Sequence, residues 1–196
     1  MMSRKVTPLR KNSRAVSRKS KNSGKAPVLT RQKPVKGPRG EDEFIDKCTE
    51  RYFFESTGVK LYDAAIRKAP QQFRAKLTEI RDQERAHAQM LREVIRTLDA
   101  DPRVMTDSAK LSQIESSGII HVVEHGNFEE VMDALLVLEL VDHAKWELLI
   151  EIADELGDDE AKESFEEALG DETDHLVYIR EQIVQTTMYR LQTRAA

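Results

Sequence analysis

The stretch Glu84-Arg85-Ala86-His87 recurs near the other end of the chain as Glu172-Thr173-Asp174-His175. In both copies a carboxylate and an imidazole lie three positions apart, which puts them on one face of a helix. Both motifs interrupt stripes of apolar residues spaced three and four apart, where a core side chain is expected. An ionised carboxylate buried without a partner costs several kcal/mol. The two motifs therefore need protons, cationic neighbours or a metal.

Two further glutamates interrupt apolar stripes in the same way. Glu55 precedes Pro70 by 15 residues, close to the distance at which the first Glu-x-x-His motif follows it. Glu139 precedes Gly157 by 18 residues, and the second motif follows that glycine at a similar distance. With a rise of about 1.5 Å per residue, each set returns to the same height in a helical hairpin. Six side chains that can bind metal are expected at one level: Glu55, Glu84, His87, Glu139, Glu172 and His175.

The apolar periodicity predicts four long helices from Glu41 onward and indicates no strand. Pro70 ends the first helix and opens the second. The third begins at Asn127, and Gly157 ends it before the fourth. Residues 100–126 are left as a long crossover. Two helical hairpins joined by such a crossover predict an all-α four-helix bundle.

Three local features refine this bundle. Asn127 and Glu130 have the spacing of a capping box. A short helix is expected within the crossover, near residues 108–116. Gly170, inside the fourth helix, costs about 1 kcal/mol relative to Ala, which predicts a close approach of backbone or ligand at that position.

The net charge of -4 conceals two contrasting parts. Residues 1–40 hold 13 of the 31 Lys and Arg, no acid and four of the six prolines, so the other 156 residues carry 18 bases against 35 acids, a balance of −17. The first part cannot bury enough apolar surface to offset its ordering entropy. We therefore expect a disordered basic tail at 1–40 and a helical domain at 41–196. The tail is expected to bind nucleic acid or another polyanion through phosphates, with a solubilising extension or a transit peptide as alternatives.

Cysteine content and hydropathy exclude other classes of protein. The single Cys48 rules out a disulfide scaffold or a four-thiolate site within this chain, and a small buried core residue is its expected role. No apolar run approaches the roughly 18 residues that cross a membrane. With no secretory segment, a cytoplasmic protein is expected. His121 and His125 fall in the crossover and are expected at the surface.

Four carboxylates and two imidazoles favour two ions of intermediate hardness, iron or manganese, over copper(I) or structural zinc. Tyr62 and Trp146 each follow a glutamate of the set by seven residues, and each is either core or a partner of the site. Asp142 and His143 follow Glu139 by three and four. Either is an extra ligand, a partner of a ligand or a member of a polar helix face.

The order Glu55, Glu84-x-x-His87, Glu139, Glu172-x-x-His175 resembles the ferritin-like di-iron carboxylate superfamily, and the Glu-x6-Tyr step to Tyr62 resembles rubrerythrin-type erythrins. Residues 138–149 look like bacterial ferritin-like domain proteins, and the likeness covers about residues 42–190. It implies a ferritin-like bundle, a homo-oligomer and two iron ions, or manganese, on the six side chains. It places Asp142 where rubrerythrins carry an additional carboxylate ligand, and makes Tyr62 a hydrogen-bonding or redox-active neighbour.

The activity expected from this resemblance is that of a di-iron oxidoreductase, of peroxidase or ferroxidase type, that reacts with oxygen or hydrogen peroxide. With one cysteine the chain lacks a four-cysteine rubredoxin-like module, so an external electron donor protein is expected. Three alternatives stay open: a di-manganese catalase, an iron-storage or DNA-protecting ferritin-like protein in a hollow shell, and a scaffold that binds through its tail.

Overall fold

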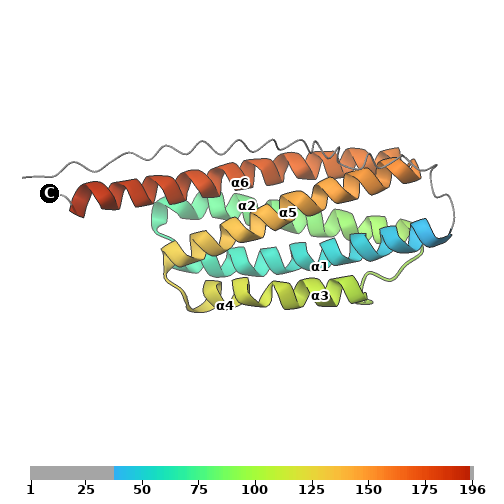
Figure 1. The fold of residues 1–196 in the computed structure, drawn as a ribbon, viewed down its shortest axis with the longest axis horizontal. Helices are drawn as coiled ribbons and strands as arrows, with labels where there is room; N and C mark the ends of the chain where they lie inside the picture. The colour runs from blue at the N-terminus through green and yellow to red at the C-terminus, as the bar shows by residue number, and fades with distance from the viewer. Residues whose placement is uncertain (1–37, 195–196) are drawn as a thin grey trace, which may run out of the picture. The chain divides into compact units, whose positions relative to one another are not determined.

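The computed structural model describes residues 38–194, and every regular element in that range is a helix (Figure 1). The elements are α1 (Pro38–Lys68), α2 (Gln71–Thr97), α3 (Asp107–Glu115), α4 (Ser117–His125), α5 (Phe128–Leu156) and α6 (Asp159–Arg194). The all-α expectation is therefore confirmed. Residues 1–37, which hold nearly all of the predicted basic tail, lie outside the described range.

The helix ends lie where the sequence chemistry places them. Pro70 separates α1 from α2. The Asn127 side chain accepts hydrogen bonds from Glu129 N at 2.9 Å and Glu130 N at 3.1 Å. The Glu130 side chain accepts a hydrogen bond from Asn127 N, which completes the predicted capping box. Gly157 ends α5 with a φ of 73°, in the left-handed region that favours glycine. Asp158 then caps α6 by accepting a hydrogen bond from Ala161 N at 3.0 Å.

The long helices pair as predicted, α1 with α2 and α5 with α6, and the crossover packs along α1 and α5 (Figure 1). The short helix expected near 108–116 is α3. A second crossover helix, α4, follows it immediately and was not expected. Its apolar residues, Ile119, Ile120, Val122 and Val123, are all β-branched, which lowers helix propensity. Packing of α4 against α5 and α1 stabilises the helix there.

The core consists of two apolar clusters with a polar layer between them. The first cluster contains Tyr62, Leu77, Leu135 and Ile179, and the second contains Cys48, Leu91, Trp146 and Phe165. Each long helix contributes to both clusters and carries its buried charged residues between the two contributions. The polar residues of all four helices consequently lie at one level, as the spacing predicted.

The expectation for Gly170 is wrong. No heavy atom lies within 4 Å of the position that a Cβ on Gly170 would take. The close approach occurs instead at Gly58 of α1, where an added Cβ would collide with the Glu84 carboxylate and lie 3.2 Å from its Cδ. Gly58 therefore makes room for a side chain of the polar layer.

None of the described helices combines the length and the low polarity that a membrane span requires.

Candidate metal centre

The polar layer brings together the six predicted side chains. Glu84, Glu139, Glu172 and His175 present ligand-type atoms that all lie within 4.8 Å of one another. Glu55, His87 and Glu172 form a second such group. A third group contains Glu55, Glu84, Asp142 and Glu172. All of these side chains are buried, and Glu172 belongs to every group.

Many polar atoms of this layer have no hydrogen bond from the described part of the chain. These atoms are both carboxylate oxygens of Glu55, Glu84 and Asp142, one each of Glu139 and Glu172, Nδ1 of His87, and Nε and Nη2 of Arg51. Arg51 lies within ion-pair distance of one oxygen of Glu55 and one of Asp142, without hydrogen-bond geometry. Buried polar groups are almost always hydrogen-bonded in native proteins. A cluster of orphaned carboxylate oxygens facing imidazole nitrogens is the arrangement that a bound cation would complete.

The two imidazoles are held from behind by a hydrogen-bonded chain. Asp171 accepts from His87 Nε2 at 3.2 Å and from the Gln83 side-chain amide at 2.8 Å. Gln83 Oε1 in turn accepts from His175 Nε2 at 3.0 Å. Because a carboxylate and an amide oxygen can only accept, both Nε2 atoms carry the proton. The Nδ1 atom of each ring is thereby free to bind metal.

Each Nδ1 atom faces carboxylates of the layer. His87 Nδ1 lies 2.9 Å from Glu172 Oε1 and 3.8 Å from Glu55 Oε2. His175 Nδ1 lies 3.2 Å from Glu172, 3.5 Å from Glu84 and 3.6 Å from Glu139. The two halves of the layer are thus alike, each with one imidazole and with Glu172 shared between them.

Burial and charge shift the ionisation of these groups in the metal-free protein. Burial raises the pKa of Glu84 and of Asp142, and raises that of Glu139 to about 7. Burial also opposes the imidazolium form, but contacts with carboxylates outweigh it and raise the pKa of His87 and His175 to about 10. The same contacts overcome burial at Glu172 and lower its pKa to about 2. Without metal, protons therefore supply the missing positive charge.

Of the residues that the sequence spacing placed near the six side chains, some contact the layer and others do not. Tyr62 is fully buried and its hydroxyl donates to Glu139 Oε1. Trp146 packs edge-on against the His87 ring, with centroids 5.6 Å apart. His143 belongs to none of the groups of the layer, and its Nδ1 lies 3.7 Å from Glu147 Oε1.

His121 and His125 are exposed on α4, and Cys48 is buried in the core, as expected.

Comparison with known proteins agrees with this geometry. The rubrerythrin family model matches residues 49–182, which is more than half of the chain and includes every residue of the layer. The chain belongs to the rubrerythrin family.

A crystal structure described as "ferritin like, diiron-carboxylate proteins" from Bacillus anthracis strain Ames is similar, with a TM-score of 0.62 and 18% identity. The match covers 75% of this chain and 99% of that one, and it shows the ferritin-like fold. No curated protein sequence matches the chain significantly.

Four residues that contact the layer of this rubrerythrin-family protein were missed by sequence reasoning: Arg51, Gly58, Gln83 and Asp171. A signal existed for two of them, since Gln83 and Asp171 each immediately precede the glutamate of a Glu-x-x-His motif. Extending the internal repeat by one residue would have found both. Arg51 precedes Glu55 by one helical turn, so a cation on a core-facing stripe was a further signal.

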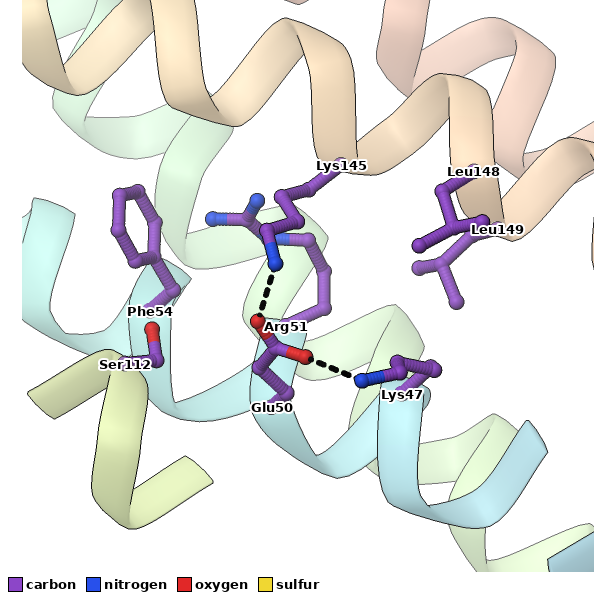
Figure 2. Close-up of a pocket in the computed structure, with 8 residues that line it drawn as sticks. All are labelled: Lys47, Glu50, Arg51, Phe54, Ser112, Lys145, Leu148 and Leu149. Carbon is purple, nitrogen blue, oxygen red and sulfur yellow. Dashed lines mark hydrogen bonds and ion pairs between the residues drawn. The ribbon is translucent and has the colours of Figure 1, made fainter. Parts of the chain in front are cut away.

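A small surface pocket reaches the outer side of Arg51. Its space admits about one water molecule. Figure 2 shows Lys145 of α5 and Lys47 of α1 reaching the two carboxylate oxygens of Glu50, at 2.6 and 3.2 Å. The pocket is lined by Lys47, Glu50, Arg51, Phe54, Ser112, Lys145, Leu148 and Leu149. Of these residues, Arg51 contacts Glu55 of the layer.

Proposed function

We propose that this protein is a di-iron oxidoreductase of the rubrerythrin type, in which a buried pair of iron ions reacts with oxygen or hydrogen peroxide. The observation that carries the proposal is the layer of orphaned carboxylate oxygens and imidazole nitrogens between two apolar clusters. Buried groups of this kind are retained at a cost in stability, which favours a functional role.

The ligand chemistry supports two ions of intermediate hardness. The proposed ligands are Glu55, Glu84, His87, Glu139, Glu172 and His175. Their four carboxylates balance the charge of two divalent ions when the imidazoles are neutral. When bound, two ferrous ions supply two electrons to the oxidant, which is the chemistry that the protein side chains themselves lack.

The surrounding side chains orient the ligands and control protons. Gln83 and Asp171 keep the protons of both imidazoles on Nε2, so Nδ1 stays available. The Tyr62 hydroxyl donates its proton to Glu139 Oε1 and would hold that carboxylate in place when metal is bound. The apolar clusters on both sides of the layer exclude bulk water.

Reduction of one hydrogen peroxide to two water molecules consumes two electrons and two protons. We propose that a separate electron donor protein returns the electrons, because this chain offers one cysteine, which is buried in the core. Turnover should then be limited by reductant rather than by peroxide.

Anaerobic stopped-flow spectroscopy of the ferrous-loaded protein tests the proposal. Mixing with hydrogen peroxide or oxygen should oxidise the centre in a single phase, and steady-state turnover should stay low until a reductase is added. Vigorous release of oxygen from peroxide without a reductant, by manganese-loaded protein, would replace this proposal with a di-manganese catalase. Uptake of many more than two irons per chain into a large shell on gel filtration would instead favour iron storage.

A further inference from the structure

A guanidinium group is buried inside the carboxylate layer. Arg51 is 2% exposed, with Nε 3.1 Å from Glu55 Oε1 and Nη2 2.9 Å from Asp142 Oδ1. Its Cζ lies 4.2 Å from the centroid of the Phe54 ring. Two bound metal ions would already give this layer several positive charges, so the additional positive charge of Arg51 needs an explanation.

The charges in the layer balance only when Arg51 is counted. The four glutamates and Asp142 are five carboxylates, whereas two divalent ions neutralise four. Arg51 is the remaining positive charge, since both imidazoles must be neutral to bind metal. Arg51 contacts Glu55 as well as Asp142, and its single charge offsets the one carboxylate that exceeds the four that two divalent ions balance.

The contacts of Asp142 agree with this charge balance. It follows Glu139 by one helical turn, so it faces the layer, but its Oδ1 is engaged by Arg51. Lys145, one turn further along α5, pairs with Glu50 rather than with Asp142 (Figure 2). The guanidinium lies over the Phe54 ring, which favours one orientation of the pair.

We infer that Arg51 is a positioning residue that holds Asp142 out of the ligand set, so that six side chains bind the metals and the divalent state is favoured. The inference rests on the metal centre proposed above. Without the guanidinium, Asp142 is a fifth carboxylate beside the metals, and no cation balances its charge. It is then free to bind one of them, and its negative charge stabilises the trivalent state.

The test uses Co(II), which reports coordination in its visible spectrum and is bound without redox chemistry. The variants are Arg51→Met, Arg51→Lys and the double variant Arg51→Met/Asp142→Leu, with Arg81→Met as a matched control. Arg81 pairs with Asp63 and Asp82 on the outside of the bundle. The double variant exchanges a buried ion pair for apolar groups of similar size, which proteins usually tolerate.

Arg51→Met should bind Co(II) about tenfold more tightly or more, with an altered spectrum, and its iron form should have a lower midpoint potential. The double variant, Arg51→Lys and Arg81→Met should resemble the wild type in affinity, spectrum and potential. A double variant that binds Co(II) tenfold more weakly with a changed spectrum would identify Asp142 as a ligand and overturn the inference. Equal potentials in wild type and Arg51→Met would also overturn it. If the wild type itself binds no Co(II), the proposed metal centre is wrong. If the wild type binds Co(II) but the variants behave otherwise, only the inference about Arg51 is wrong.

Discussion

Glu84 is a side chain of the layer that destabilises the metal-free protein and is proposed to bind metal. Burial raises its pKa, and both of its oxygens lack hydrogen bonds from the described residues, so in the metal-free protein it is a cost. Glu84→Gln should therefore lower the metal content from about two ions per chain to one or fewer, while the metal-free variant stays helical and is at least as stable as the wild type. Metal analysis and circular dichroism check this. Glu79→Gln, at an exposed position of the same helix, is the control and should change neither. An unfolded Glu84→Gln protein would contradict this account of the residue.

The imidazoles give the metal-free protein a characteristic dependence on pH. The pKa of His87 and of His175 is raised to about 10, above the ordinary value of 6.5, so their stabilising contribution is complete below pH 6.5 and is lost as pH rises through 10. The pKa of Glu139, raised to about 7, acts in the same direction between pH 4.5 and 7.

Thermal denaturation of the metal-free protein should consequently show a Tm lower by at least several degrees at pH 9 than at pH 6. The metal-bound protein should depend less on pH in this range, because bound imidazoles carry no second proton. Metal binding near neutral pH should also release one proton from each imidazole, and further protons from the glutamates whose pKa burial raises, which a pH indicator dye measures. A Tm of the metal-free protein that rises between pH 6 and 9 would contradict the proposed role of the imidazoles.

Among the helices, substitutions at two glycines distinguish the effect of helix propensity from the effect on the metal site. Gly170→Ala should stabilise the protein by about 1 kcal/mol and leave metal affinity unchanged, because its surroundings are open. Gly58→Ala gains the same helix propensity, but its Cβ would displace the Glu84 carboxylate. It should lower metal affinity by about tenfold or more. Isothermal titration with Co(II) and chemical denaturation check both variants. Equal metal affinities in the two would show that the space beside Gly58 is immaterial.

The long helices were predictable because each carries its own signals. Apolar spacing, Pro70, the capping box at Asn127 and the left-handed Gly157 all act within a few residues, and the structure contains each of them. Helix α4 was not predicted, because its β-branched residues lower helix propensity and its contacts with α5 and α1 are not visible in the sequence. The purpose assigned to Gly170 failed for a related reason. A glycine in a helix signals a close approach only if a neighbouring helix reaches that position, and the sequence of one helix does not reveal this.

At the scale of the whole molecule, the site was predictable as far as the hairpin geometry reaches. Equal distances from a turn placed the six ligand-type side chains at one level, since helix rise per residue is fixed. The partners Arg51, Gln83 and Asp171 depend on which faces of different helices meet. The hydrogen bond from Gln83 to Asp171 joins α2 to α6, and the ion pair of Arg51 with Asp142 joins α1 to α5. Such contacts follow from packing angles that a single helix does not encode.

The contrast in charge between the tail at 1–40 and the remainder of the chain gives a prediction for the complete chain. The 13 basic residues of the tail should bind DNA through phosphates, with little sequence preference and an affinity that falls steeply with salt. Deleting residues 1–40 should abolish DNA retardation at low salt and leave the metal content unchanged. Equal retardation by the full-length and truncated proteins would refute a role for the tail.

Reconstitution with ferrous iron measures directly whether the buried layer holds two metal ions. Protein purified without chelators and reconstituted anaerobically should hold about two irons per chain after desalting. On exposure to air it should develop the near-ultraviolet absorption of oxygen-bridged ferric iron, and the Glu84→Gln protein should develop neither the stoichiometry nor the absorption. Iron close to zero per chain in folded wild-type protein would contradict the account.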